Sequence, residues 1–232
     1  MTEFNPQWKT FEALVKEVLE YGFNDGPQVN RARIEGWLNE AQINIARKVD
    51  APEFQKTYSL ELVQGQYKYP LPEDLLRIED VYFPELVTRL TMLDLQQFDS
   101  MGHGELGSGL SVTAPPTFYT LYGKEIWVFP VPPSGGPTEV LEVRYIAKPA
   151  YMTTAAAVPT LNPDYYQLLI KFAVIRAMEG EDDFELASQH MTRYKADLDE
   201  YATDVQFRID DRPHVVDGTW GSFGTAGSRG VL

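Results

Sequence analysis

The side chains best suited to acid–base catalysis or metal binding in this chain are its three histidines, His103, His190 and His214. Zinc sites and general acid–base catalysis need a second ligating or ionisable group held close to the first. None of the three histidines has such a partner at ligand spacing in the sequence. The chain also has no cysteine, which excludes disulfides, thiolate ligands and a thiol nucleophile. We therefore expect no metal site.

Other patterns that carry chemistry are weak. The glycine-rich stretches 102–105 and 107–109 resemble phosphate-binding loops, but they lack the lysine and the strand-to-helix setting of a Walker loop. No Gly-x-Ser-x-Gly motif provides a nucleophile elbow. Paired acids such as Glu73-Asp74, Glu79-Asp80 and Asp182-Asp183 are more common at helix starts and on surfaces than in catalytic dyads. We predict that the protein is not an enzyme, with no catalytic residue and no cofactor.

The charge of the chain narrows the classes of partner. A formal net charge of −14 argues against a conventional nucleic-acid-binding protein, which presents a basic surface to phosphates. The main effect of this charge is expected to be solubility, and an acidic surface could also let DNA pass without sticking. No apolar run approaches the ~18 residues of a membrane span, and residues 1–10 lack the features of a signal peptide. We expect a protein made in the cytoplasm, without a membrane partner.

Helical periodicity predicts a pair of helices within residues 1–52. The first is expected to begin at Asn5-Pro6, an N-cap followed by proline, and to end at Gly22. The second is expected over 28–49 and is ended by Ala51-Pro52. Because the turn between them is short, we expect an antiparallel hairpin. The two apolar stripes comprise Trp8, Phe11, Leu14, Val15, Val18 and Leu19, and Ile34, Trp37, Leu38, Ala41, Ile45 and Val49.

In residues 53–157 the spacing of apolar residues changes from the helical period. This region is predicted to form an inserted β-rich domain, either a sandwich or a barrel-like fold. We expect a helical turn at 71–76, a short helix over 91–101 and an exposed loop at 103–114. Apolar alternation and turn residues predict strands at 54–63, 66–70, 77–83, 117–122, 125–130 and 139–147.

Residues 158–205 are predicted to form the second helix pair. Asn162-Pro163-Asp164 supply a cap, a proline and an acid to a helix that ends near Gly180. This helix is apolar on nearly every side, which suits the middle of a bundle. Asp182-Asp183 begin the last helix, whose outer face carries mainly acidic residues. We therefore predict an α+β fold, mainly a helical bundle of two helix pairs with the β-rich domain inserted between them.

Residues 206–232 are rich in glycine and poor in large apolar groups. Ordering such a segment costs roughly 1–2 kcal/mol per residue in backbone entropy, more than its own burial can offset. We therefore predict an extended C-terminal tail that docks on another molecule, with a tail that stays disordered as the alternative. The residues expected to enter pockets of the partner are Phe207, Val215, Val216, Trp220 and Phe223.

Aromatic residues crowd the predicted β-rich domain. Core packing explains most of them, and any on exposed strand faces would suit a protein interface, where Tyr and Trp are enriched. The residues concerned are Tyr58, Tyr67, Tyr69, Tyr82, Phe83, Tyr119, Tyr122, Trp127 and Phe129.

Several motifs in the middle and late parts of the chain point to a known family. A Gly-x-Tyr-x-Tyr-x-Leu-Pro-x-Asp pattern runs from Gly65 to Asp74. A Pro-x-x-Tyr helix start lies at Pro163–Tyr166, and Tyr194-Lys195 follows late in the second helix pair. With these motifs, residues 60–200 resemble the head–tail adaptor (connector) proteins of tailed bacteriophages. The similar stretches are 62–83, 118–133, 143–153 and 158–201.

The resemblance implies a structural head-to-tail adaptor of a phage virion. It implies a homo-oligomeric ring of about twelve subunits, a dodecamer, placed beneath the portal protein. The ring would join the portal to a downstream tail or nozzle protein in the neck of the particle. DNA would pass through its lumen during ejection without specific binding, and the C-terminal tail would run along or insert into the portal. The glycine-rich loop at 102–116 has no counterpart in the family.

Two hypotheses from other classes remain open. A tail or baseplate module that binds a carbohydrate or a receptor would use exposed Tyr and Trp rings to stack on sugars, although the flanking helix pairs argue against it. A hydrolase hidden in the β-rich domain is disfavoured because the chain lacks catalytic motifs.

Overall fold

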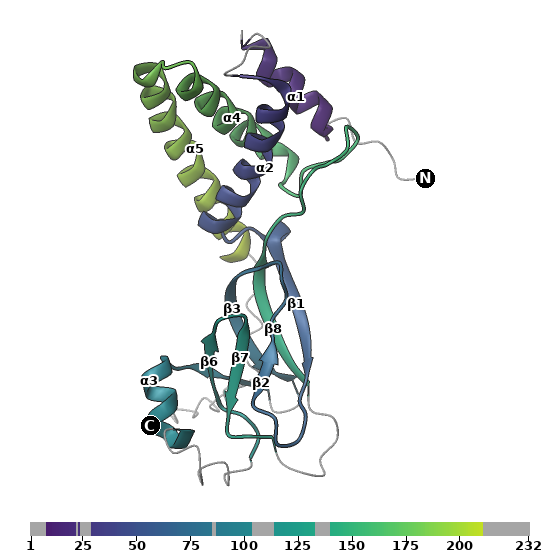
Figure 1. The fold of residues 1–232 in the computed structure, drawn as a ribbon, viewed down its shortest axis with the longest axis vertical. Helices are drawn as coiled ribbons and strands as arrows, with labels where there is room; N and C mark the ends of the chain where they lie inside the picture. Colours follow the sequence, from purple (N-terminus) through teal and green to yellow (C-terminus); the bar gives the residue numbers. More distant parts are fainter. Residues whose placement is uncertain are drawn as a thin grey trace, which may run out of the picture.

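The computed structural model describes residues 8–21, 23, 29–84, 87–103, 114–132 and 140–210, without the side chains of 102–103 and 207–210. The molecule is elongated, with a helical bundle at one end and a β-sandwich at the other (Figure 1). Each part contains its own cluster of buried apolar side chains. This α+β architecture confirms the predicted bundle of two helix pairs with an inserted β-rich domain.

The first helix, α1, spans Phe11–Glu20 and begins later than predicted. Its N-cap is Thr10, whose hydroxyl oxygen accepts a hydrogen bond from the backbone N–H of Ala13 at 3.3 Å. The predicted cap at Asn5-Pro6 lies outside the described residues. Trp8 precedes the helix and keeps 46% of its surface exposed. The prediction that Trp8 belongs to the buried stripe was therefore wrong.

The second helix, α2, spans Arg31–Lys48 and agrees with the predicted helix. The side-chain oxygen of Asn30 accepts from the N–H of Arg33 at 3.0 Å and thereby satisfies one free donor of the first turn. The predicted stripe is buried except for Trp37, which is half-buried.

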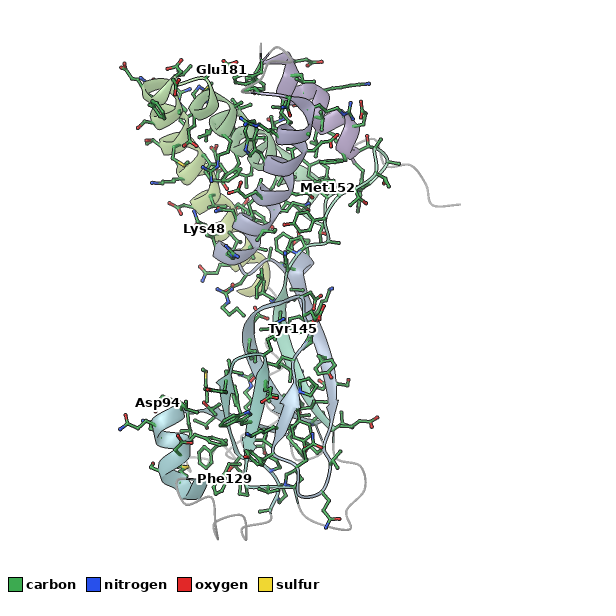
Figure 2. The ribbon with its side chains drawn as sticks, in the orientation of Figure 1. Lys48, Asp94, Phe129, Tyr145, Met152 and Glu181 are labelled. Carbon is green, nitrogen blue, oxygen red and sulfur yellow. The ribbon has the colours of Figure 1, made fainter. Side chains whose placement is uncertain are left out.

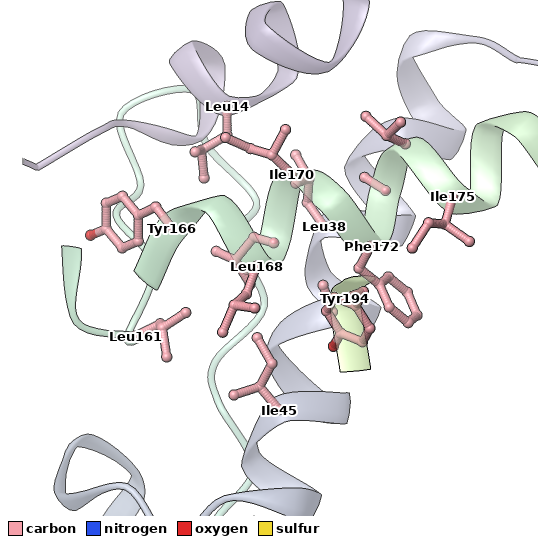
Figure 3. Packing of buried hydrophobic residues seen from close by; sticks show 14 of the residues in the cluster. Leu14, Leu38, Ile45, Leu161, Tyr166, Leu168, Ile170, Phe172, Ile175 and Tyr194 are labelled. Carbon is pink, nitrogen blue, oxygen red and sulfur yellow. The ribbon is translucent and has the colours of Figure 1, made fainter. Parts of the chain in front are cut away.

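Helix α4, Tyr166–Gly180, follows a short 3₁₀ turn at Pro163–Tyr165 and runs through the middle of the bundle (Figure 3). It contacts α1, α2 and α5, which explains why the sequence is apolar on nearly all of its faces. Its buried residues are Tyr166, Leu168, Leu169, Ile170, Phe172, Ala173, Val174, Ile175, Ala177 and Met178.

Helix α5, Phe184–Asp210, is the longest helix described. The carboxylate of Asp183 caps it by accepting a hydrogen bond from the N–H of Leu186 at 3.3 Å, as the acidic pair at 182–183 predicted. The helix continues past its predicted end at Val205. Residues 206–210, expected to belong to the extended tail, are therefore helical, and residues 211–232 lie outside the description.

The inserted domain is a sandwich of two four-stranded sheets. Strands pair antiparallel except β5 and β6, which run parallel. The two sheets bury a common core that includes Val81, Ile126 and Val143. The first sheet has the order β1 (Gln55–Glu61), β8 (Val140–Ala147), β3 (Leu75–Phe83) and β4 (Thr88–Arg89). The second has the order β2 (Lys68–Pro70), β7 (Glu125–Phe129), β6 (Phe118–Tyr122) and β5 (Thr91–Met92).

Two local predictions in this domain were wrong. The helical turn expected at 71–76 is a turn followed directly by β3, because Leu75 already pairs with Ala147 of β8. The helix expected over 91–101 starts with strand β5, and helix α3 covers only Leu95–Phe98, followed by a π-helical turn at Asp99–His103. Pairing with neighbouring strands overrides local helix preference in both cases.

Polar contacts around Asp74 link β1 and β8 next to the start of β3, and a separate ion pair reaches the bundle. The Asp74 carboxylate lies 2.7 Å from the Lys56 ammonium and accepts a hydrogen bond from the Tyr145 hydroxyl at 3.0 Å. The hydrogen bond and charge of Lys56, helped by Tyr145, hold the pKa of Asp74 below its usual value. Arg77 of β3 also pairs with Asp50, which follows α2. The contacts of Asp74 therefore link strands of the sandwich to one another, and the Arg77–Asp50 pair joins β3 to the end of α2.

Candidate assembly surfaces

The residues predicted to dock the tail lie almost entirely outside the described structure. Val215, Val216, Trp220 and Phe223 fall within 211–232, and Phe207 lies in α5 without a described side chain. Helix α5 runs from the far tip of the bundle to the junction with the sandwich (Figure 1). The chain therefore leaves the last helix near the middle of the molecule.

The histidines are not brought together. His103 ends the π-helical turn after α3, His190 lies on α5, and His214 lies outside the described residues. His190 lines a cavity of about 230 Å³ with Tyr21, Lys171, Val174 and Arg193. Among the described residues, no three His, Asp or Glu side chains gather to form a metal site.

The acidic pairs have structural partners. Glu79 accepts a hydrogen bond from the Gln55 amide at 3.2 Å, and Asp80 pairs with Arg89 at 3.3 Å. Asp74 accepts from the Lys56 ammonium at 2.7 Å, and Asp183 caps α5. In the described part of the chain, no helix is long and apolar enough to cross a membrane.

A connecting segment, residues 148–162, is fastened to the side of the bundle by two buried amides of α2. The side chain of Asn39 donates to the carbonyl of Met152 at 3.2 Å and accepts from its N–H at 2.7 Å. The side-chain oxygen of Gln42 accepts from the N–H of Thr160 at 2.9 Å. Buried polar groups of this kind stay only where their partners are fixed, so the segment has one register on the helix.

The start of α1 holds the same segment from the other side. The N–H groups of Phe11 and Glu12 have no partner within their own helix, and they donate to the carbonyls of Ala157 and Ala155 at 2.7 and 3.1 Å. These bonds position the entry into α1 next to the connecting segment.

Large apolar side chains project from this part of the bundle. Trp8, Tyr151 and Val158 have exposed fractions of 46%, 57% and 38%. The ammonium of Lys148 lies 4.9 Å from the centre of the Tyr151 ring. We call the three residues Trp8, Tyr151 and Val158 the aromatic flank.

A groove lies on another side of the bundle, between the end of α2 and the second half of α5. Its volume is about 270 Å³. Two lysines and one aspartate line it together with apolar groups, and we call it the α2–α5 groove. Its residues are Lys48, Val49, Lys195, Leu198, Asp199 and Ala202.

The outer face of the second sheet carries a group of rings. The Trp127 ring lies 4.9 Å from Tyr122, 6.0 Å from Tyr67 and 6.4 Å from Phe98 of α3. The Lys68 ammonium lies 4.3 Å from the centre of Trp127. Tyr122 remains 54% exposed, so part of the predicted aromatic surface exists on a strand face. Trp127 itself is half-buried beneath the neighbouring rings and Lys68.

The sequence did not predict the hydrogen bonds by which Asn39 and Gln42 hold the connecting segment. Both amides lie beside apolar positions of the α2 stripe, Leu38 and Ala41, and a polar residue in that setting is a recognisable signal of a buried hydrogen bond. Their partners are more than a hundred residues away and could not be identified from spacing.

Comparison with known proteins identifies the family of this chain. Residues 9–217 match the model of the family described as SU10 adaptor protein. The match covers both the bundle and the sandwich, and it confirms the resemblance to phage head–tail adaptors. No curated protein sequence matches the chain.

Proposed function

This chain belongs to the SU10 adaptor protein family, whose members are phage head–tail adaptors, and we propose that its copies form the ring that joins portal and tail. Membership of the family over residues 9–217 is the observation that carries this proposal. It implies an adaptor role in the phage virion. One acid of each pair is a cap or an ion-pair partner, namely Asp183, Asp74 and Asp80, which agrees with a structural role.

The proposed ring contains about twelve copies, the number that the resemblance to phage head–tail adaptors implies, and it closes through rotational symmetry. Its neighbours are the portal protein on one side and a tail or nozzle protein on the other. The net charge of −14 supports a lumen through which DNA passes without specific binding, because an acidic wall repels phosphate.

The C-terminal tail is proposed to dock on the portal through Phe207, Val215, Val216, Trp220 and Phe223. Composition supports this assignment, since a glycine-rich segment with a few large apolar residues cannot form its own core. Helix α5 ends near the junction, so the tail is attached beside both folded parts.

We favour the adaptor role over the carbohydrate-binding module. The Trp127 ring is contacted by Tyr122, by the edge-on ring pair with Tyr67, and by the Lys68 ammonium, which leaves less of its surface free for a sugar.

Native mass spectrometry of the full chain with the purified portal ring tests the proposal. We expect a complex that contains the portal and one complete ring of this chain. The full chain alone, at the same concentration, is the reference. A protein that stays monomeric and does not bind the portal would overturn the proposed role.

A further inference from the structure

We propose that neighbouring copies meet head to tail, with the aromatic flank of one copy seated in the α2–α5 groove of the next. This inference rests on the proposed ring and names the two surfaces that would build it. The occupant of the groove is therefore a second copy of this chain.

The positions of the two surfaces suit such a contact. A ring whose copies are related by rotation needs two different surfaces on opposite sides of each subunit. Figure 2 shows Met152, next to Tyr151, on one side of the bundle and Lys48, at the end of α2, on the opposite side. Both lie on the half of the bundle nearer the sandwich, so neighbouring copies could meet at one level.

The backbone that carries Tyr151 and Val158 of the aromatic flank is fixed before any partner binds. Tyr151 and Val158 project from a segment whose backbone is fixed by Asn39, Gln42 and the first turn of α1. A surface that is already rigid loses less conformational entropy when it binds, which favours association. Buried hydrogen bonds at the base of exposed apolar side chains are the arrangement expected for a preformed interface.

The groove offers both space and complementary chemistry. Its volume of about 270 Å³ exceeds the ~150 Å³ of apolar cavities that accept a benzene ring. Val49 and Leu198 are buried and form an apolar floor. The ammonium groups of Lys48 and Lys195 suit the faces of Tyr and Trp rings, which attract cations. A Tyr151 side chain from a neighbour would thus meet apolar contact from Val49 and Leu198, with two lysines and one aspartate also lining the groove.

Cysteine cross-linking tests the contact directly, because the native chain has no cysteine. Tyr151→Cys and Ala202→Cys are placed together in the full chain, and assembled particles are treated with a short bifunctional maleimide. We expect a ladder of covalently joined chains on a denaturing gel. Each single variant should give no ladder, since a head-to-tail contact does not bring residue 151 or residue 202 next to its own copy.

Two controls distinguish a wrong contact from the absence of a ring. Tyr122→Cys combined with Ala202→Cys uses an equally exposed tyrosine on the sandwich and should give no ladder. An amine-reactive cross-linker on native particles reports whether copies are neighbours at all. A ladder with that reagent but none with the 151–202 pair overturns the inference and leaves the ring standing. No ladder with either reagent overturns the ring itself. A strong 151–151 product would show a symmetric contact and would also overturn the inference.

A second measurement covers the case in which the cysteine variants fail to assemble. Truncating an aromatic anchor at an interface commonly costs 2 kcal/mol or more, which is about thirtyfold in affinity. Tyr151→Ala in the full chain should therefore weaken self-association about thirtyfold, measured by sedimentation. Tyr122→Ala should leave it unchanged, and equal effects of both variants would contradict the proposed contact.

Discussion

The amide of Asn39 pairs with both backbone groups of Met152, a residue 113 positions later in the chain. One side chain thus satisfies a donor and an acceptor of a segment without secondary structure. Because the pair is buried, water cannot replace either bond. The contact joins α2 to the segment that leads from the sandwich back into the bundle.

Replacing Asn39 should destabilise the fold. Asn39→Ala leaves the N–H and the carbonyl of Met152 without partners, and we expect a loss of about 1–3 kcal/mol in the free energy of unfolding. Urea denaturation measures it. Gln189→Ala, which removes an exposed amide on α5, should cost less than about 0.5 kcal/mol. Equal losses would show that the Asn39 pair contributes no specific stability.

Two buried tyrosines should respond in opposite ways to loss of the hydroxyl. Tyr194 is 1% exposed, and its hydroxyl has no hydrogen-bond partner among the described residues. Burial raises the pKa of Tyr194 above its usual range. Because an unpaired buried hydroxyl is unfavourable, Tyr194→Phe should leave stability unchanged or raise it by up to about 1 kcal/mol.

The matched variant is Tyr69→Phe. Tyr69 is 3% exposed, but its hydroxyl donates to the carbonyl of Gln66 at 2.8 Å and accepts from the N–H of Val63 at 3.0 Å. This variant should lose about 1 kcal/mol. Thermal unfolding compares the two. A larger loss for Tyr194→Phe than for Tyr69→Phe would mean that Tyr194 has a partner outside the described residues.

The contacts of Asp74 in the sandwich should weaken in acid. Lys56 and Tyr145 lower the pKa of Asp74 in the folded state, so the charged carboxylate stabilises the fold at neutral pH. That contribution is lost as the pH falls below about 4, the ordinary value for aspartate. The difference in unfolding free energy between the native chain and Asp74→Asn should therefore shrink from pH 7 to low pH.

The size of this effect should be modest. Lys56 and Asp74 are both partly exposed, and such pairs contribute less than about 1 kcal/mol. Urea titrations across the pH range measure it, and about 1 M salt should reduce it through screening. A difference that grows as the pH falls would contradict the sign of the pKa shift.

The tail should be dispensable for folding and required for portal binding. Truncation after Asp210, the end of α5, removes none of the described contacts and should leave the unfolding free energy unchanged. Trp220→Ala with Phe223→Ala should weaken portal binding by roughly 2–4 kcal/mol, or about 30- to 1000-fold. Calorimetry with the portal ring measures this, and Ser222→Ala is the control. Unchanged binding by the truncated chain would refute the docking role.

Local patterns alone determined most of the elements. The apolar periodicity of α2 and α4 and the turn residues between β6 and β7 predicted these segments correctly, because each signal lies within a few neighbouring residues. The motif from Gly65 to Asp74 and the Pro-x-x-Tyr helix start also indicated the family, which the match over 9–217 confirmed.

Tertiary structure decided the features that depend on distant partners. Leu75 lies in a strand because Ala147 pairs with it, and α1 begins at Phe11 because Thr10 caps it and Ala157 receives its first N–H. The hydrogen bonds between Asn39 and Met152 likewise join residues more than a hundred positions apart. The same is true of the α2–α5 groove, which brings Lys48 next to residues of α5. Spacing along a chain carries no information on such pairs, since only packing of the whole bundle brings them together.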